Sequence, residues 1–443
     1  MIGPSFIILG LGLGSGEVIL WPYLASNYGL GMVWAMLIGI TMQFFINMEV
    51  ERYALVNGES IFVGFARMWR WLPAWFFLST FIAWVWPGIG LAGASLLSAL
   101  FGIESARGIG IIVFLLIGGI LSIGKVLYRT VETLQKYLIS IGVPIIVLLT
   151  LYLSSAQDFV ELTKGLVGIG KGFSFLPAGI VIGQFLGALA YAGAGGNLNL
   201  AQSCYVRDKG YGMGKYADKI TSVITAKEGT KNFSLTGNTF PITQANLGRF
   251  RAWWKTTNLE HLLIFWGLGL FTMLTLSLLA YVTAFGKAET GNIWFVVLEA
   301  NAIGARTLPV FGMLFLVTTG VMLCATQLTV LDSTSRIMTE NTLLLLRKAK
   351  KVPVSRVYYA ILWAQILFGI AVFSLGFDQP LTLITLGAIL NAFTMFSYTG
   401  LLLFLNNTML ARELRPSLWR NLALVGTFGF FGVFCLLTIL EQF

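Results

Sequence analysis

The sequence is short of charge, cysteine and histidine. Charged residues make up 11% of its 443 positions, whereas soluble domains carry about a quarter, so an ordinary soluble protein is excluded. The three cysteines, Cys204, Cys324 and Cys435, lie in apolar stretches and lack zinc spacing, which excludes a disulfide framework and a cysteine-based zinc site. There is one histidine, His261, and no Ser/His/Asp constellation or phosphate loop. We therefore expect neither an enzyme nor a bound cofactor.

Long apolar runs are what the chain has instead. Hydrophobic residues make up 57% of it, and the mean hydropathy is +0.82. Because about 20 apolar residues cross the hydrocarbon of a bilayer, the pattern predicts about eleven membrane-spanning helices. They are expected at residues 3–27, 31–50, 73–101, 108–125, 137–155, 176–206, 261–285, 308–340, 356–375, 380–405 and 418–440. The sequence thus predicts an all-α polytopic membrane protein with one integral membrane transport domain over residues 1–443.

The basic residues are distributed by side of the membrane. Of the 29 Lys and Arg residues, 24 fall in or beside alternate loops and five on the other side. Cytoplasmic loops are the ones rich in Lys and Arg, so we predict an inner (plasma) membrane protein with its N-terminus cytoplasmic and its C-terminus outside. The net charge of +10 is then a topology signal and not a sign of nucleic acid. The expected partners are bilayer lipid and a small cation or small solute; the sequence indicates no oligomeric state.

The first apolar stretch is interrupted at its centre. Residues 10–17 read Gly-Leu-Gly-Leu-Gly-Ser-Gly-Glu, and this glycine content lowers helix propensity. Glu17 places an ionisable group at the same depth, where such groups are costly and usually functional. Backbone that leaves a helix inside a membrane is tolerated where it is buried in protein or lines a watery cavity. The pattern predicts that helix one unwinds near residues 13–17.

A second interruption follows five spans later. Residues 192–199 read Ala-Gly-Ala-Gly-Gly-Asn-Leu-Asn, and we expect helix six to unwind near 192–197 and to face the break in helix one. Two interrupted helices five spans apart are typical of transporters built from inverted repeats. The repeats are predicted at 3–155 and 176–405, with an extra helix at 418–440. The alternative is that both glycine runs are packing seams between helices.

Several short motifs are similar to those of the Nramp family of divalent-metal transporters. Gly3-Pro4-Ser5-Phe6 resembles the family's Gly-Pro-Gly-Phe opening, and Ile337-Met338-Thr339-Glu340 resembles its Val-Met-Glu helix exit. The family's Asp-Pro-Gly-Asn metal motif falls on Gly14-Ser15-Gly16-Glu17, and its Met-Pro-His-Asn motif falls on Ala194-Gly195-Gly196-Asn197. The resemblance implies the LeuT-like inverted-repeat fold and transport by alternating access.

The same resemblance implies that most of the family's ligands are replaced. The family's metal-binding Asp falls on Gly14, its Asn on Glu17 and its soft Met on Ala194. The small residue three positions before that Met falls on Tyr191, and Asn197 alone keeps the family's residue. The chain therefore resembles a divergent Nramp-related transporter whose metal chemistry is altered.

The residues around the two interruptions form the predicted substrate site. Its candidates are Gly14, Ser15, Glu17, Tyr191, Ala194 and Asn197. For a metal substrate the predicted ligands are Glu17 and Asn197, whose oxygen atoms suit a harder cation than a thioether does. The leading hypothesis is a secondary-active cation transporter. The alternatives are a carrier of a small organic or amine solute, or a transport-inactive sensor or scaffold with the same fold.

Three further polar residues are candidates for a pathway, namely Asn199, Asp332 and Arg336. Asp332 and Arg336 are four residues apart and share a helix face. They form either a mutually neutralising pair near the cytoplasmic end of the helix or part of an ion path. Glu49 and Glu51 are expected to be interfacial anchors.

Proton coupling through the third helix is not expected. The family's third-span acids fall on Trp86 and Ile89, which carry no proton, and Glu17 is the titratable group left at the predicted site. We predict that substrate uptake into proteoliposomes is not driven by protons along that route. Internal pH recorded during uptake tests this, and stoichiometric acidification that persists in the Glu17→Gln variant would contradict it.

Overall fold

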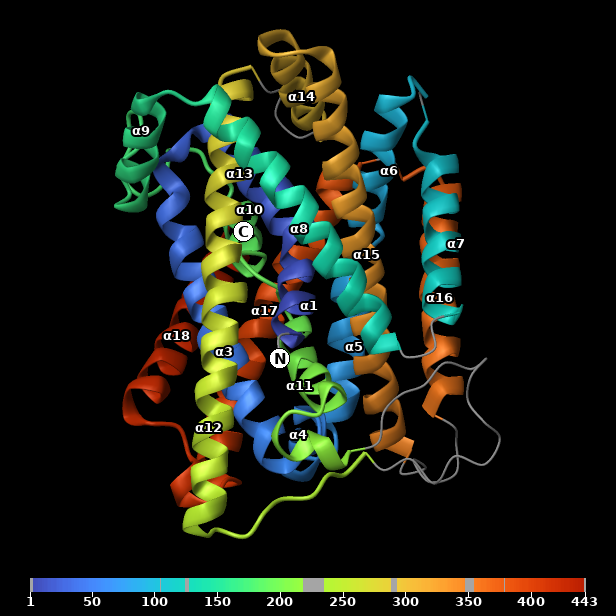
Figure 1. Ribbon diagram of the computed structural model, residues 1–443, viewed down its shortest axis with the longest axis vertical. Coiled ribbons are helices and arrows are strands. Elements are labelled where there is room, and N and C mark those ends of the chain that lie inside the picture. Colours follow the sequence, from blue (N-terminus) through green and yellow to red (C-terminus); the bar gives the residue numbers. More distant parts are fainter. Residues whose placement is uncertain are drawn as a thin grey trace.

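The computed structural model describes residues 3–103, 105–123, 127–217, 235–287, 293–346, 354–377 and 379–441. Parts of two predicted basic loops, 218–234 and 347–353, and the end of the helix predicted at 108–125 lie outside the described residues. The described chain is a bundle of helices (Figure 1), and its one β feature is an isolated bridge between Ile169 and Ser174. The all-α membrane fold predicted from the sequence is confirmed.

The elements of the first part of the chain are α1 (Pro4–Gly12), η1 (Leu13–Leu20), α2 (Trp21–Tyr28), η2 (Leu30–Met32), α3 (Val33–Asn57), α4 (Ile61–Met68), α5 (Leu72–Trp84), α6 (Gly88–Leu100), α7 (Arg107–Ile123), α8 (Leu127–Leu153) and α9 (Ala156–Leu166). Those of the second part are α10 (Ile182–Ala190), α11 (Leu198–Lys209), η3 (Gly212–Tyr216), α12 (Gln244–His261), η4 (Leu262–Leu268), α13 (Gly269–Ala284), α14 (Phe295–Arg306), α15 (Pro309–Leu346), α16 (Val354–Ser374), α17 (Pro380–Thr408), η5 (Arg412–Leu414) and α18 (Leu418–Leu440). Both η1 and η4 are π-helical, and the other η elements are 3₁₀ turns.

Nine helices among the described residues are long and apolar enough to cross a membrane. Two of the predicted spans are not among them. The first corresponds to α7, which has only 17 residues. The second, predicted at 176–206, is split between α10 and α11. The predicted count of eleven spans therefore stays a prediction.

Helix one does not unwind at its glycine run, so that expectation is corrected. The elements α1, η1 and α2 follow one another without a gap, and the interruption is the π-helical segment η1. π-Helical winding keeps the backbone hydrogen-bonded within the helix, as the bond from the Trp21 N–H to the Gly16 carbonyl shows. The segment is completely buried, and a bilayer interior offers no water to an unwound backbone.

Helix six unwinds as predicted. Its first half, α10, ends at Ala190, and its second half, α11, begins at Leu198. Between them Gly195 and Gly196 have φ angles of 76° and 50°, in the left-handed region that favours glycine. A Cβ atom on Gly196 would also lie only 1.7 Å from Oδ1 of Asn391 in α17. Backbone conformation and close packing both require glycine here.

The third predicted span, at residues 73–101, is also interrupted, which the sequence analysis did not predict. We call it helix three; it is not α3. Its halves are α5, which ends at Trp84, and α6, which begins at Gly88. Pro87 lies between them, and proline lacks an N–H group and clashes with the preceding helical turn. At the start of α6 the N–H of Gly90 donates to the side-chain oxygen of Gln327 in α15 at 2.9 Å. A side chain thus replaces a partner that the interrupted helix has lost.

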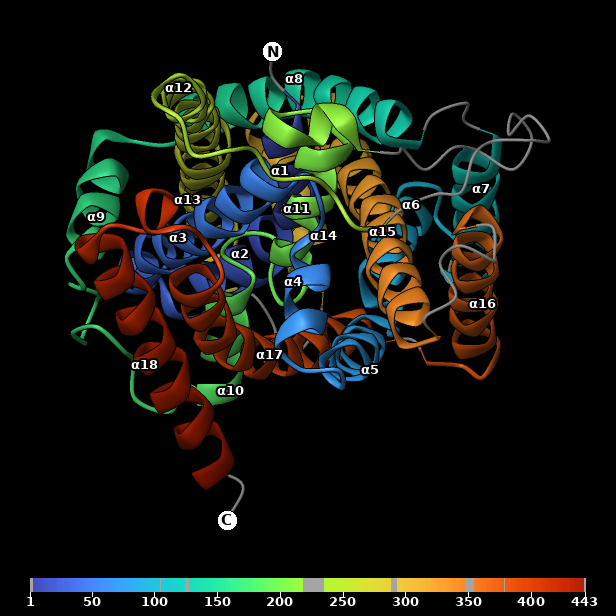
Figure 2. The same ribbon diagram turned by 90° about the horizontal axis from the view of Figure 1, so that it is seen from below.

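The facing parts of helices one and six lie inside the bundle, whereas α5 of helix three has exposed apolar side chains such as Leu78. Both views show α1 and α11 surrounded by other helices (Figure 1, Figure 2). At one edge α7 and α16 lie side by side, while α18 packs on α17 and extends away from the rest (Figure 2). The end of the bundle that carries α4 and the start of α12 holds the basic loops (Figure 1). We call this the basic end and the other the opposite end.

The contact between helices one and six depends on Gly16. A Cβ atom there would lie 1.6 Å from the carbonyl oxygen of Tyr191, and overpacking costs about 1–3 kcal/mol. We predict that Gly16→Ala lowers the unfolding midpoint of the purified protein in detergent. Gly119→Ala is the matched control, because a Cβ atom there meets nothing within 4 Å, and its midpoint should hold or rise. An unchanged midpoint for Gly16→Ala would show that these segments do not touch.

Candidate functional site

The two glycine runs bring helix one against the break in helix six. A Cβ atom on Gly12 would lie 3.0 Å from the carbonyl oxygen of Gly193. Two residues further along, on another face of helix one, a Cβ atom on Gly14 would lie 2.4 Å from Thr326 of α15. The hydroxyl of Thr326 donates to the carbonyl oxygen of Gly10 at 2.9 Å. The predicted face-to-face arrangement of the two interruptions is therefore observed, with α15 as a third wall.

Glu17 follows Gly16 in η1 and is buried, and its side chain points toward α13. Its Oε2 atom accepts a hydrogen bond from the hydroxyl of Thr272 in α13. Its Oε1 atom has no hydrogen-bond partner among the described residues, and neither has the buried hydroxyl of Ser15. One carboxylate oxygen and one hydroxyl are therefore free to bind a ligand at the π-helical segment.

Asn197 lies at the start of the second half of helix six and turns toward helix three. Its amide donates to the hydroxyls of Ser79 and Thr80 in α5 at 2.9 and 2.8 Å, while its Oδ1 atom has no partner among the described residues. Among the described residues, no hydrogen bond joins Asn197 to Glu17. The described residues also contain no cluster of three acids, histidines or cysteines able to hold a metal. The two predicted metal ligands thus have separate partners, and their joint role stays a prediction.

Gln43 of α3 closes the break in helix six, a role that the sequence analysis missed. Its amide nitrogen donates to the carbonyl oxygens of Leu189 and Ala190 at 3.3 and 2.9 Å. Its amide oxygen accepts from the N–H of Gly195 at 3.1 Å. The signal in the sequence is a glutamine near the middle of a largely apolar span. The Gln43 side chain therefore supplies hydrogen-bond partners for some of the backbone N–H and carbonyl groups that the unwinding frees.

Tyr191 forms an aromatic and amide cluster at the start of the break. Its ring stacks on Trp84 with a centroid distance of 5.2 Å and an interplanar angle of 19°. Its hydroxyl accepts from the amide of Asn391 at 3.0 Å. The indole N–H of Trp84 and Oδ1 of Asn391 lack partners among the described residues. Ala194 is buried in the same segment and contributes only a methyl group.

The predicted pair of Asp332 and Arg336 is confirmed and belongs to a larger buried charge network. Nε of Arg336 lies 3.0 and 2.9 Å from the two oxygens of Asp332. The same guanidinium contacts Asp208 of α11 at 2.5 Å, and beside it Arg207 contacts Glu340 of α15 at 2.6 Å. The network joins the second half of helix six to α15 on the side of the basic end. It is a candidate closure of the pathway.

The third pathway candidate, Asn199, is separate from this network. Its amide donates to the hydroxyl of Tyr398 in α17 at 3.0 Å, and its Oδ1 atom has no partner among the described residues. The residue is completely buried.

Glu49 and Glu51 are not interfacial anchors, which corrects that expectation. Both are buried within α3. Glu49 pairs with Arg52 at 2.7 Å and with Arg420 of α18 at 3.2 Å. The Arg52 guanidinium also lies 4.0 Å from the ring centroid of Trp254. These contacts attach α18 to the core of the bundle.

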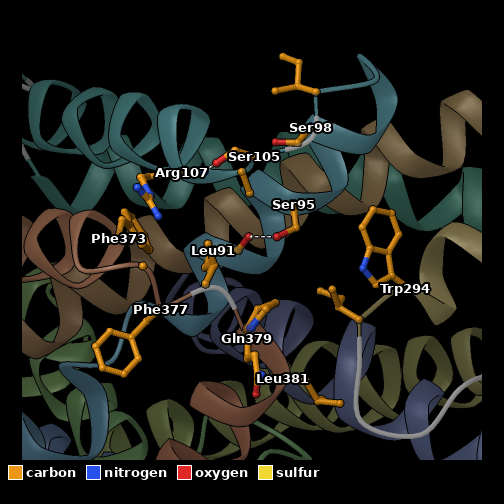
Figure 3. A pocket seen from close by; sticks show the side chains of 15 residues that line it. Leu91, Ser95, Ser98, Ser105, Arg107, Trp294, Phe373, Phe377, Gln379 and Leu381 are labelled. Atoms are coloured by element: carbon orange, nitrogen blue, oxygen red, sulfur yellow. Dashed lines mark hydrogen bonds between the residues drawn. The ribbon is translucent and has the colours of Figure 1, made fainter.

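A cavity of about 650 Å³ opens at the opposite end, away from the predicted site. It lies between the ends of α6, α7, α16 and α17, and Ser95, Ser98, Arg107 and Gln379 contribute polar groups to its wall (Figure 3). None of the predicted substrate residues lines it. In the described conformation the residues at the break are buried.

No protein-family model and no curated protein matches the sequence. Solved structures of membrane transporters are nevertheless similar in fold. Two mutant forms of the manganese transporter of Eremococcus coleocola match with TM-scores of 0.66 and 0.67, at 13% identity, over 99% of this chain and 86% of theirs. MhsT in complex with L-phenylalanine matches with a TM-score of 0.53, at 15% identity, over 99% of this chain and 98% of that one. These likenesses confirm the predicted fold, which Nramp-related and LeuT-like transporters share.

The role of Gln43 can be tested by removing its amide. Gln43→Leu would leave two carbonyls and one N–H of the break without this partner, and each unsatisfied buried group costs about 1–3 kcal/mol. We predict a lower unfolding midpoint and faster hydrogen exchange of the amides at 190–196. Gln157→Leu, on the exposed surface of α9, is the control and should change little. Unchanged exchange in Gln43→Leu would refute the closing role.

Proposed function

We propose that the protein is a secondary-active membrane transporter that moves a small cation by alternating access. The observation that carries the proposal is Glu17, a buried carboxylate with one free oxygen at the point where helix one meets the unwound part of helix six. Ionisable groups at this depth are costly and are typical of substrate or ion sites. The transporter fold described above supports the same conclusion.

The two ends of the bundle supply the elements that alternating access needs. Toward the basic end, the network of Asp332, Arg336 and Asp208 ties helix six to α15. Toward the opposite end, a cavity reaches into the bundle. We propose that the network opens when the substrate leaves on the basic side. By the positive-inside rule this side is the cytoplasm, so the N-terminus is cytoplasmic and the C-terminus outside.

The proposed repeat organisation accounts for the placement of both interruptions. One repeat covers residues 3–155 and contains helix one, and a second covers 176–405 and contains helix six. The helix at 418–440 is additional to the repeats. All three lie in one transport domain, consistent with the packing of α18 on α17.

The proposed substrate is a harder cation than the family's usual metals. The thioether position is Ala194, and the nearest cysteine along helix six, Cys204, lies ten residues on, within α11. Its sulfur lies 3.7 Å from a carboxylate oxygen of Glu340, in the charge network. The donors left near the break are oxygens, such as those of Glu17 and Ser15. Oxygen donors favour ions such as Mg²⁺ or Ca²⁺ over soft metals.

A second candidate substrate is a small organic cation such as an amine. The observation that favours it is the stacked pair of Trp84 and Tyr191 beside the break. Aromatic faces attract ammonium groups, and Glu17 supplies a negative charge for either kind of cation. A solute of this kind would use the free Oδ1 atom of Asn391 as an acceptor.

Uptake into proteoliposomes tests the proposal. We expect flux of Mg²⁺ or Ca²⁺ that falls at least tenfold in Glu17→Gln, since the substitution removes the charge but keeps the shape. Glu161→Gln, which changes an acid of the peripheral helix α9, should transport like the parent. Competition by simple amines, lost in Trp84→Leu, would favour the organic cation.

Two outcomes would contradict the proposal. Micromolar Cd²⁺ binding that Glu17→Ala abolishes would show that a transition-metal site persists without sulfur. Absence of flux for every cation and amine from a folded protein would identify a transport-inactive sensor or scaffold instead.

A further inference from the structure

A stripe of polar residues runs along α3 from the break in helix six toward the basic end. Gln43, Asn47 and Glu51 are spaced four residues apart, so they share one face of the helix. Gln43 bonds the break, and Glu51 accepts a hydrogen bond from Gln202 of α11. The stripe therefore faces helix six. Asn47, midway along it, lies at the level of Asn199, because the two helices run in the same direction.

Unused polar atoms are concentrated along α3 and the adjoining α11, where Glu51 bonds Gln202 and Asn199 bonds Tyr398 of α17. Among the described residues no partner is found for four side-chain oxygens and one nitrogen, which are Asn47 Oδ1 and Nδ2, Glu51 Oε2, Asn199 Oδ1 and Gln202 Oε1. None of these residues is more than 1% exposed. Buried polar groups nearly always have a partner, so four free oxygens within two helical turns indicate a ligand site. A set of oxygen donors selects a hard cation.

Among the residues that the structure describes, no lysine or arginine balances the charge of the Glu51 carboxylate. The groups that face it are Gln202, Thr257, Glu260 and His261, and none of them is a lysine or arginine. One monovalent cation would neutralise this carboxylate. A divalent cation would leave a net charge buried between the helices, which is costly.

Glu260 does not supply a second free carboxylate. Its Oε1 atom accepts from the N–H groups of Gly3 and Ser5, at the start of α1, at 3.0 and 3.3 Å. Its Oε2 atom accepts from the hydroxyl of Tyr211 at 2.8 Å. Burial and the nearby Glu260 carboxylate raise the pKa of Tyr211, so its hydroxyl stays a donor. His261 is likewise engaged, since its Nδ1 atom lies 3.0 Å from the hydroxyl of Ser5.

We propose that α3 and α11 bind a monovalent alkali cation such as Na⁺ between the carboxylate of Glu51 and the amide oxygens of Asn47, Asn199 and Gln202. This site differs from the substrate site at Glu17, whose carboxylate bonds α13. The cation would bridge α3 to the second half of helix six and hold that half in place. The site stands whether the transported substrate is a metal ion or an amine.

Binding of Na⁺ to the purified full-length protein tests the proposal. In detergent, NaCl is exchanged for N-methylglucamine chloride at constant ionic strength, and binding is followed by calorimetry and by the unfolding midpoint. We expect saturable Na⁺ binding with a rise in the midpoint. Glu51→Gln should weaken it at least tenfold, and Glu17→Gln should leave it unchanged.

Asn47→Ala keeps the test valid if Glu51→Gln does not fold. Neither polar atom of Asn47 has a partner among the described residues, so this variant should match the parent midpoint without Na⁺ and lose most of the increase with it. Na⁺ binding lost in Glu17→Gln but kept in Glu51→Gln and Asn47→Ala would place the ion at helix one and overturn the proposal. Equal behaviour in Na⁺ and N-methylglucamine would also overturn it. Both of these outcomes can be observed by binding and unfolding measurements alone, without a transport assay.

Discussion

The structure depends on how a backbone that leaves the helix inside a membrane finds its hydrogen-bond partners. No water is available in the hydrocarbon to replace them. Helix six solves this with a side chain from another helix, since Gln43 bonds both sides of the break. Helix three does the same at Gly90, which donates to Gln327. Helix one avoids the problem, because its winding changes to a π-helix and does not stop. Glycine then lets helices one and six pack without side chains between them at Gly12 and Gly16.

The buried acids of the described residues have two kinds of surroundings. In the network around Arg336 and in the cluster around Glu49, every acid has at least one arginine partner. Such pairs are stable when buried because each charge is neutralised by a neighbour. Glu17 and Glu51 instead have only uncharged donors as hydrogen-bond partners, and each has a free oxygen. Such a carboxylate can accept a partner from outside the chain, and both proposed binding sites rest on this difference.

Much of the fold could be predicted from hydropathy and glycine content, because the length of a span and the loss of helix propensity are local properties. Unwinding of helix six followed from this. The π-helical course of helix one did not, because it is set by neighbours such as Thr326 and Tyr191, far away in the sequence. The break at Pro87 was not predicted, because it depends on a partner from α15, Gln327, that the sequence does not indicate. The role of Gln43 and the burial of Glu49 and Glu51 were missed for the same reason: each depends on a partner that only the tertiary arrangement brings into contact.

The stacking of Trp84 on Tyr191 has a practical consequence for anyone who studies this protein in solution. An indole ring lies directly against the segment that unwinds, with its N–H unpaired among the described residues. Indole emission responds to the polarity and hydrogen bonding around the ring. The difference in fluorescence between the parent and a Trp84→Phe variant is therefore an optical signal that originates at the break itself. Substrates could be screened by it without a label, a radioisotope or a membrane vesicle.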